Sequence, residues 1–442
     1  EVVIVGGGIS GGALLYELAR YTDVKSIALV EKYGGLATLN SKGTANSQTV
    51  HCGDIETNYT FEKAQKVSKT ARMVVKYGLQ HGYQGKYMFD GQKMAIGVGD
   101  VEVEYIKNRY EEFKELYPYL EFYDKAELAK IEPKIILNSD GTHRAENVVG
   151  MGVKSGEYTT VDYGAFTTTF IENAKKDKSE CDVYLNSRVD EIYRNGDKFY
   201  IQTANGLSIS ADFVVVNAGA HSLYLAHKMG YGLDFGCLPV AGSFYLTKQK
   251  LLNGKVYMVQ NPKLPFAALH GDPDILADGC TRFGPTALAL PKLERYHENW
   301  GSFLDFCKTL NFDTAIAGIL FDLFKDSEIR NYILRNFLFE VPYLNKKLFV
   351  KDARKIVPSL TTNDIYYAKG FGGVRPQVLN KTEKKLMLGE ASINPKTGII
   401  FNMTPSPGAT SCLGNALRDV REVCEYLGRN FNEAKLNEEL FD

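Results

Sequence analysis

The chain has 442 residues, of which 44% are hydrophobic and 24% charged, the composition of a soluble globular protein long enough for two domains. Its formal net charge of −1 at pH 7 gives no electrostatic basis for binding nucleic acid. The seven cysteines are scattered without a C-x-x-C pair, which argues against a disulfide framework and a metal site, and no apolar run is long enough to span a membrane.

The first residues predict a nucleotide-binding βαβ unit. Residues 2–5 and 26–30 have the continuous apolar pattern of buried strands, and residues 9–20 between them have a helical pattern. The unit contains a G-x-G-x-x-G motif at Gly6, Gly8 and Gly11. These glycines allow, in order, a tight turn, close approach to a pyrophosphate and close packing of helix on strand.

An acidic residue completes this signature. Glu31 ends the second strand, twenty residues after Gly11. A carboxylate there accepts hydrogen bonds from ribose hydroxyls. The strand, helix, strand and acid together predict a bound dinucleotide much more specifically than the glycines alone.

Later segments extend the same domain. Residues 183–210 alternate in polarity between turns at Asn195-Gly196 and Asn205-Gly206, which predicts short antiparallel strands. A buried strand then ends at Asn217-Ala218-Gly219, and residues 409–427 have the spacing of an amphipathic helix. We expect one discontinuous nucleotide-binding domain of residues 1–76, 166–236 and 386–442, and a second domain of residues 77–165 and 237–385.

The sequence favours FAD over a nicotinamide dinucleotide. Flavoenzymes that are reduced by NAD(P)H usually carry a second glycine-rich βαβ unit, and Asn217-Ala218-Gly219-Ala220 lacks that fingerprint. The loop "FNMTPSPGATSCLGNAL" (401–417) leads instead into a helix. The N-terminus of such a helix suits the pyrimidine end of a flavin, where negative charge grows on reduction.

Blocks spread nearly from end to end carry a family resemblance. They are "VVIVGGGISG" (2–11), "KGTANSQTVHCGDIETNYT" (42–60), "QKMAIGVGD" (92–100), "LPVAGSFY" (238–245), "VQNPKLPFAALHGDPD" (259–274), "TRFGPTALALPKLER" (281–295), "GFGGVRPQVL" (370–379) and "FNMTPSPGATSCL" (401–413). In these blocks the chain resembles the FAD-dependent malate:quinone oxidoreductases, and more loosely the L-2-hydroxyglutarate dehydrogenases of the same flavin fold.

The resemblance implies a fold and an activity. The fold is α/β, with an FAD-binding Rossmann-like domain (glutathione-reductase-like, amino-acid-oxidase subtype) and a mixed α+β substrate domain. The activity is oxidation of L-malate to oxaloacetate by hydride transfer to non-covalent FAD, with electrons passed to membrane quinone. The resemblance also implies a peripheral protein on the cytoplasmic, inner face of the cell membrane.

Histidine is the expected catalytic base. Oxidation of a 2-hydroxy acid removes a hydride from C2 and a proton from the hydroxyl, and histidine accepts a proton best near neutral pH. Two of the seven histidines lie in the matched blocks, His270 in "AALHGDPD" and His51 in "TVHCGD". We expect His270 to be the base and His51 to contact the flavin or its pocket, with His51 as the alternative base.

A dicarboxylate substrate needs two cationic or multi-donor partners. Arg375 in "GGVRPQ" and Arg282 in "TRFGP" are the main candidates, because each lies beside glycine and proline where a loop can direct a side chain inward. Gln48 and Lys93 are weaker candidates. For FAD we expect contacts from Gly6, Gly8, Ser10, Gly11, Glu31, Lys32, Ser41, Asn46, Ser47, Val189, Gly219, Gly408, Thr410 and Ser411.

Residues 301–340 are rich in Phe, Leu and Ile, with charges every few residues. This amphipathic pattern is typical of helices that pack on a core, and also of helices that rest on lipid. Both interpretations stay open, and the second would give quinone a way to reach the protein.

Three alternative functions remain open. An L-2-hydroxyglutarate dehydrogenase or oxidase would share the fold, and one methylene changes discrimination by only about 1–3 kcal/mol. A soluble NAD-dependent dehydrogenase would need only the first βαβ unit. A flavin-binding redox sensor would need no clamp for a dicarboxylate.

Overall fold

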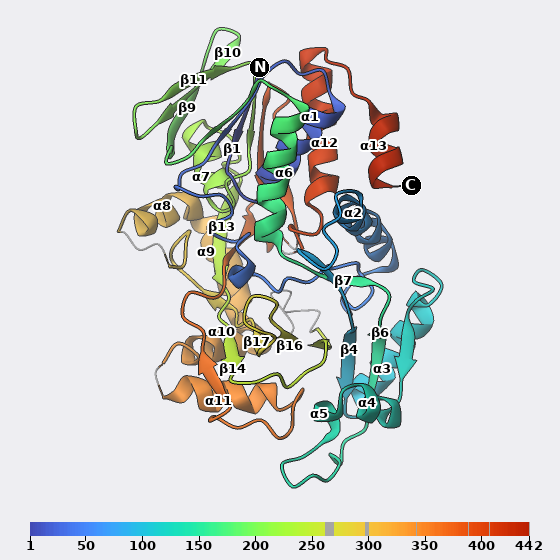
Figure 1. Cartoon of the computed structure of the whole chain (residues 1–442). Coiled ribbons are helices and arrows are strands. Elements are labelled where there is room, and N and C mark those ends of the chain that lie inside the picture. Colours follow the sequence, from blue (N-terminus) through green and yellow to red (C-terminus); the bar gives the residue numbers. More distant parts are fainter. Residues whose placement is uncertain (261–268, 297–299, 342, 388, 406, 442) are drawn as a thin grey trace.

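A sheet buried on both faces forms the upper half of the molecule in Figure 1. Alternate residues of β1 (Val2–Val5) belong to the hydrophobic clusters on opposite faces, so every position in the strand is apolar. The structure is a computed structural model that describes residues 1–260, 269–296, 300–341, 343–387, 389–405 and 407–441. The sheet is parallel except for its first strand, in the order β22 (Ala391–Ile393), β23 (Ile399–Met403), β12 (Phe213–Val216), β1, β2 (Ile27–Val30) and β8 (Cys181–Tyr184).

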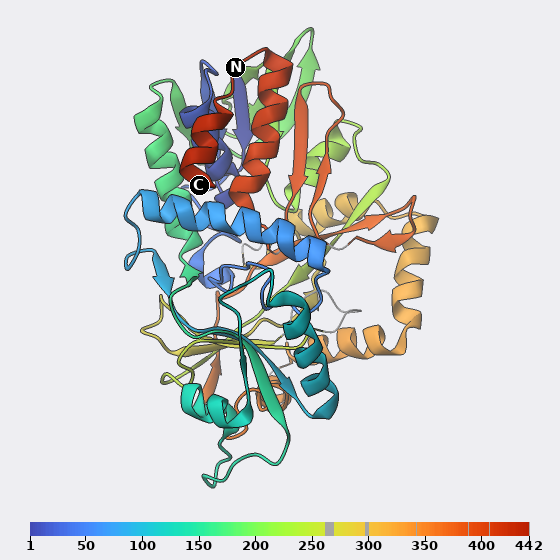
Figure 2. The same ribbon diagram turned by 90° about the vertical axis from the view of Figure 1, so that its right-hand side faces the viewer.

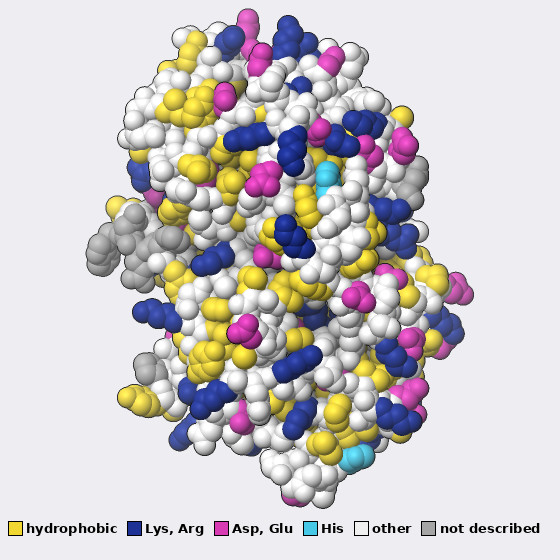
Figure 3. Space-filling view, viewed as in Figure 1, with side chains coloured by type: hydrophobic (Ala, Val, Ile, Leu, Met, Phe, Trp, Pro, Cys, Tyr) yellow, Lys and Arg dark blue, Asp and Glu magenta, His cyan; other side chains and the backbone are white. Residues whose placement is uncertain are grey.

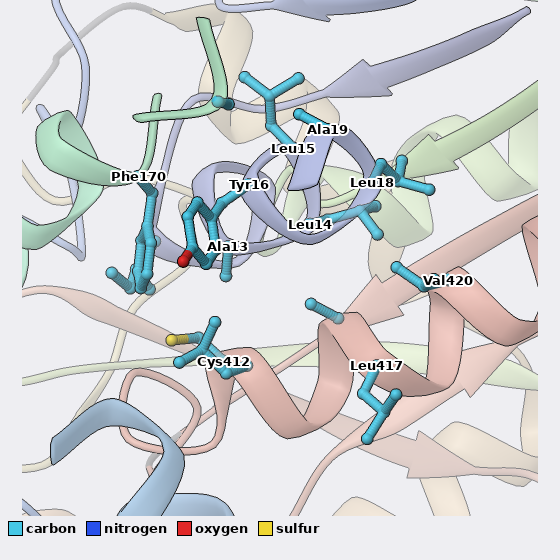
Figure 4. Close-up of a cluster of buried hydrophobic side chains, with 14 of the residues drawn as sticks. Ala13, Leu14, Leu15, Tyr16, Leu18, Ala19, Phe170, Cys412, Leu417 and Val420 are labelled. Atoms are coloured by element: carbon cyan, nitrogen blue, oxygen red, sulfur yellow. The ribbon is translucent and has the colours of Figure 1, made fainter. Parts of the chain in front are cut away.

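Helices from distant parts of the chain cover one face of this sheet. They are α1 (Ile9–Tyr21), α2 (Phe61–Gln80), α6 (Tyr163–Asp177), α12 (Cys412–Leu427) and α13 (Glu433–Leu440). In Figure 4, Leu14 of α1 lies near Val420 of α12, while Phe170 of α6 lies beside Tyr16. The helices predicted at 9–20 and 409–427 are confirmed, the second beginning at Cys412.

The other face is covered by α7 (His221–Lys228) and by a three-stranded antiparallel sheet. This sheet has the order β11 (Ser208–Ala211), β10 (Lys198–Thr203) and β9 (Val189–Asn195). Gly196 and Gly206 adopt positive φ angles of 61° and 86° at the two turns. The run of short antiparallel strands predicted over 183–210 is therefore confirmed from Val189 onward, whereas residues 183–184 belong to the parallel strand β8.

A mixed eight-stranded sheet forms the core of the lower half (Figure 1). All of its strands come from residues 77–165 and 237–385. Antiparallel pairing dominates, and only β15 and β4 run parallel. The order is β19 (Ile365–Tyr367), β14 (Tyr245–Thr247), β17 (Thr281–Gly284), β16 (His270–Pro273), β15 (Lys255–Met258), β4 (Lys93–Val98), β6 (Val148–Val153) and β5 (Glu121–Tyr123).

A four-stranded antiparallel sheet lies between the halves, in the order β18 (Leu288–Ala289), β13 (Phe235–Ala241), β20 (Val374–Asn380) and β21 (Lys385–Leu386). β3 (Met88–Asp90) pairs with β7 (Tyr158–Val161). The remaining helices are α3 (Asp100–Phe113), α4 (Lys125–Ile131), α5 (Pro133–Ile136), α8 (Trp300–Leu310), α9 (Thr314–Lys325), α10 (Ser327–Leu338), α11 (Leu344–Ala353) and the short 3-10 helix η1 (Gly43–Ala45).

The amphipathic segment 301–340 is helical, as its pattern predicts, in α8, α9 and α10. Figures 1 and 2 place these three helices along one edge of the molecule. On the face seen in Figure 3, Lys and Arg side chains are interspersed with Asp and Glu, in keeping with the net charge near zero.

Candidate active site

A cavity of about 880 Å³ lies where the two halves meet. Its walls include the glycine motif and Glu31 from the upper half, and Phe244, Pro285 and Arg375 from the segment 237–385. The volume falls within the range of about 300–1,000 Å³ found for ligand pockets. Residues from both ends of the chain line the cavity, among them Gly6 and Thr410.

The glycine motif forms one end of the cavity. Gly6 has a φ angle of +114°, and a Cβ on it would lie 2.4 Å from the Asn217 carbonyl oxygen. A Cβ on Gly11 would lie 1.9 Å from the Gly6 carbonyl oxygen, so Gly11 serves helix packing and does not line the cavity among the described residues. The Ser41 hydroxyl accepts a hydrogen bond from the Ile9 N–H at 2.9 Å, at the first turn of α1. The remaining N–H groups of that turn favour a phosphate there.

Glu31 lies at the neighbouring wall, where a ribose is expected. Its carboxylate accepts hydrogen bonds from the Gly7 N–H at 2.7 Å and the Tyr33 N–H at 2.8 Å. Burial raises the pKa of Glu31, and these two backbone hydrogen bonds oppose the rise. Each carboxylate oxygen keeps a lone pair for a ribose hydroxyl. Lys32 and Val189 also line this part of the cavity.

The first turn before α12 forms the opposite end. Gly408 and Thr410 line the cavity, whereas Ser411 is outside the lining and donates a hydrogen bond to Glu390 Oε1 at 2.5 Å. The Thr410 hydroxyl lies 2.8 Å from the Tyr163 hydroxyl and accepts a hydrogen bond from the His51 N–H at 3.2 Å. This end of the helix therefore holds His51 in place as well as presenting its N-terminus to the cavity.

The segment 40–51 runs along the cavity between the halves, and side chains fix it on both sides. The Asn40 amide donates to the Val374 carbonyl at 2.8 Å and accepts from the Val374 N–H at 2.9 Å, as a strand partner would. Gln48 is buried with a φ angle of +55°, a left-handed conformation that is strained for a non-glycine residue. Its amide donates to Asp274 Oδ1 at 3.0 Å, which holds this conformation.

His51, which lines the cavity, forms an acid–base pair with Glu56. His51 Nδ1 lies 2.5 Å from Glu56 Oε1, and the Glu56 side chain is 6% exposed. Burial alone would raise the pKa of Glu56, but the hydrogen bond and charge of His51 hold that pKa below its ordinary value. Because the Glu56 carboxylate accepts a hydrogen bond, Nδ1 is assigned the proton and donates this hydrogen bond to Glu56. Nε2 is then the nitrogen that can accept a proton. Nε2 lies 3.3 Å from the Ser47 hydroxyl, and both residues line the cavity.

His270 lies behind the cavity wall. Its ring stacks on Tyr257 at 4.3 Å between centroids, and the Tyr257 ring meets the His51 ring edge-on at 6.0 Å. His270 is 3% exposed and does not line the cavity within the described part of the chain. Tyr257 thus separates the two histidines, and only His51 faces the cavity.

Arg375 lines the cavity from β20, a strand rather than the loop expected from its glycine and proline neighbours. The adjacent Val374 is the residue that Asn40 binds, which fixes this part of the strand. Burial lowers the pKa of Arg375, and the phenols of Tyr332 and Tyr257 partly offset that effect. A guanidinium desolvated in this way forms strong hydrogen bonds to a carboxylate.

The other substrate-binding candidates lie outside the cavity lining of the described chain. Arg282, also in a strand, is fully buried and binds Asp272 and Asp274, each at 2.9 Å. Lys93 is buried and binds Asp54 at 2.8 Å, and this partner raises the pKa of Lys93 although burial opposes it. Gln48 is engaged with Asp274. The contacts of these residues are with buried acidic side chains around the cavity.

Sequence reasoning missed several residues of the site. Glu56, Asn40 and Tyr257 were not singled out, although the acid five residues after His51 was a signal that could have been used. Of the expected FAD contacts, all except Gly11 and Ser411 line the cavity. Backbone donors at one end, an acid for a ribose and a helix N-terminus at the other make the cavity fit FAD. No group of three potential metal-ligating side chains is found among the described residues.

Comparisons with known proteins agree on one family. A family model for malate:quinone oxidoreductase (Mqo) matches residues 1–435. A probable malate:quinone oxidoreductase of Campylobacter jejuni is 63% identical over 442 residues, covering 100% of this chain and 98% of the relative. A malate:quinone oxidoreductase of Helicobacter pylori is 50% identical, with 100% and 97% covered.

Solved structures confirm the fold. The L-α-glycerophosphate oxidase of Mycoplasma pneumoniae with FAD bound superposes with a TM-score of 0.65 at 20% identity, covering 98% of this chain and 95% of that one. The glycine oxidase of Geobacillus kaustophilus gives 0.64 at 14% identity, with 96% and 94% covered. The expected FAD-binding Rossmann-like fold is therefore confirmed.

Proposed function

The chain belongs to the malate:quinone oxidoreductase family, and we propose that the cavity between its two halves is where L-malate is oxidised, with His51 as the base. The protein is an FAD-dependent enzyme that converts L-malate to oxaloacetate and transfers the electrons to a quinone. The alternative substrate L-2-hydroxyglutarate is not favoured, because the relatives at 63% and 50% identity are named for malate.

The observation that carries the catalytic proposal is that His51, which is paired with Glu56, lines the same cavity as Arg375. Bound FAD supplies the acceptor for the hydride from malate C2. The His51 Nε2 atom takes the hydroxyl proton as the carbonyl of oxaloacetate forms. Glu56 keeps the Nδ1 proton in place and stabilises the imidazolium that results.

Arg375 binds a substrate carboxylate in this proposal. Its guanidinium is desolvated, and Asn40 fixes the backbone beside it. A planar fork of donors suits a carboxylate and holds the rest of the molecule in one orientation. Substrate is thereby positioned with its hydroxyl towards one wall of the cavity, while Arg282 stays in its buried ion pairs.

Arg375→Met should weaken malate binding about tenfold to a hundredfold, the loss expected for a charge-assisted hydrogen bond. FAD content should stay unchanged, since Arg375 is at the substrate side. Anaerobic titration of flavin reduction with L-malate measures the apparent Kd. Arg72→Met, at an exposed position on α2, is the matched control. An unchanged Kd in the Arg375 variant would remove this residue from the substrate site.

Glu56→Gln should slow flavin reduction by malate about tenfold to a hundredfold, as loss of a carboxylate behind a working histidine does. The pH profile should also move. Glu56 carries its charge at neutral pH, because its pKa lies below the ordinary value, and that charge favours the protonated imidazole. Removal of that charge should shift the acid limb of the rate profile towards lower pH. Stopped-flow reduction across pH measures both effects.

Three controls separate this role from a structural one. Glu62→Gln, at an exposed position, should leave the rate and profile unchanged. In a His51→Ala background, Glu56→Gln should add no further loss, because residues that act as a unit are not additive. His270→Ala should retain most of the reduction rate. A normal rate in His51→Ala, with a large loss in His270→Ala, would return the base to His270.

We propose in addition that the protein docks on the cytoplasmic face of the cell membrane. The apolar face is defined here as the exposed large hydrophobic side chains of residues 303–344, which include Phe312 (65% exposed), Phe321 (69%) and Tyr343 (92%). Exposed apolar clusters of this kind mark contact with lipid or protein. The quinone acceptor is lipid-soluble, which favours lipid. All seven cysteines are unpaired, in keeping with a reducing compartment.

No helix in the described part of the chain has the length and apolarity needed to cross a bilayer. Because the apolar burial of two Phe side chains in lipid would be lost, the double variant Phe312→Ser/Phe321→Ser should reduce co-sedimentation with phosphatidylglycerol-containing vesicles about tenfold or more. Flavin reduction by malate should be unaffected. Val101→Ser, 86% exposed on α3, is the control. Equal sedimentation of the double variant and the control would rule out this face.

A further inference from the structure

A second, smaller cavity adjoins the main one. We name it the annex; its volume is about 160 Å³, and it is lined among others by Asn40, Gly219, Leu293, Arg295, Tyr296 and Gly370. Asn40, Gly219 and Val374 line both cavities, so a single wall separates them. A cavity of about 150 Å³ admits one benzene ring. The annex therefore has room for one ring beside the flavin-binding cavity, on a different side from His51.

The annex lining combines buried charged side chains, Arg295 and Glu294, with apolar surface. The Arg295 side chain is 7% exposed, and its Nη2 atom donates to Glu340 Oε1 at 2.9 Å and to the Tyr367 hydroxyl at 3.2 Å. Its Nη1 atom is buried and has no hydrogen-bond partner among the described residues. An unsatisfied guanidinium N–H in a desolvated position gains from an acceptor oxygen. Leu293 and Tyr296 provide hydrocarbon and an aromatic ring beside it.

The glycine-rich turn at residues 370–373 keeps the annex open. Gly370 has a φ angle of +86° and nothing lies within 4 Å of where its Cβ would be. Gly372 has a φ angle of +106°, and a Cβ on it would lie 1.9 Å from the Gly242 carbonyl oxygen. No side chain can therefore project from these positions without strain, and the chain passes close to the cavity as bare backbone.

A hydrogen bond links the annex to the apolar face. Arg295 binds Glu340, which follows the last turn of α10, and the exposed residues Val341, Tyr343 and Leu344 of the apolar face come directly after it. Tyr296 is 36% exposed at the annex and precedes α8. A ring held in the annex is thus close to the surface that we assign to lipid.

We propose that the annex binds the ring of the quinone acceptor, with the Arg295 guanidinium beside a quinone carbonyl oxygen. This inference rests on the proposed function, because it presumes that malate occupies the main cavity. Malate loses two electrons and two protons in becoming oxaloacetate, and a quinone gains two electrons and two protons in becoming a quinol. The overall reaction balances without a further co-reactant. Because malate and quinone bind at separate sites in this proposal, a substitution at one site can alter one half-reaction and leave the other unchanged.

Arg295→Met tests the proposal directly. With decylubiquinone as the probe, its KM should rise about tenfold to a hundredfold, since a charged donor is lost. Anaerobic reduction of the flavin by L-malate should stay within twofold of the wild type. Equilibrium binding of decylubiquinone, followed by quenching of intrinsic fluorescence, should weaken by the same factor as the KM. Arg335→Met, which removes the ion pair between Arg335 of α10 and Asp352 of α11, is the control.

A second variant decides the matter if Arg295→Met does not fold. Tyr296→Ala changes a partly exposed side chain of the annex, and it should raise the quinone KM while leaving malate reduction intact. Unchanged quinone KM in the folded variants would overturn the proposal. So would equal loss in both half-reactions, or competition between L-malate and decylubiquinone for the annex, which would mark an anion site.

One experiment distinguishes an error in the annex proposal from an error in the malate assignment. If L-malate does not reduce the wild-type flavin, the malate assignment falls. Dithionite-reduced enzyme can still be mixed with decylubiquinone, and the rate of flavin reoxidation reports the annex alone. A slower reoxidation in Arg295→Met than in Arg335→Met supports the annex, and equal rates refute it.

Discussion

The segment 40–51 is hydrogen-bonded to both halves of the molecule, and the shape of the cavity depends on that double attachment. Asn40 pairs with Val374 of the substrate sheets, Ser41 caps the first turn of α1, and Gln48 is bound to Asp274. His51 closes the segment against Thr410 and Glu56. These attachments order the groups of the site before malate enters. Less conformational entropy is therefore lost when the substrate binds.

A buried charge network supports this segment from the substrate side. Lys255 donates to the Ser47 carbonyl at 3.0 Å and lies 3.3 Å from Asp272 Oδ2, which also binds Arg282. Burial lowers the pKa of Lys255, and its acidic neighbours oppose that effect. Buried ion pairs seldom add stability over apolar packing, because desolvation offsets their attraction. Their value here is geometric: they hold Ser47 and the strained Gln48 beside the cavity, whereas removing one partner would leave an unpaired charge.

Local sequence patterns indicated the glycine motif and its acid, whereas contacts between distant residues around the cavity could not be predicted from them. Glycine spacing and the acid at Glu31 depend on backbone geometry within one βαβ unit, so they are legible in the sequence. The contact between Gln48 and Asp274 joins residues 226 positions apart, and no spacing rule reveals it. For the same reason the sequence could not reveal that Arg282, a candidate substrate ligand, forms ion pairs with two buried aspartates. No sequence pattern indicated that the Tyr257 ring lies between the rings of His270 and His51.

The central claim is that L-malate reduces the flavin bound in this cavity without any quinone present. Anaerobic mixing of the purified protein with L-malate, and separately with L-2-hydroxyglutarate, tests it through the absorbance of the oxidised flavin band. We expect rapid bleaching by L-malate without any quinone present, and much slower bleaching by L-2-hydroxyglutarate. Bleaching by L-2-hydroxyglutarate alone, or by neither acid, would contradict the assignment of malate to this cavity.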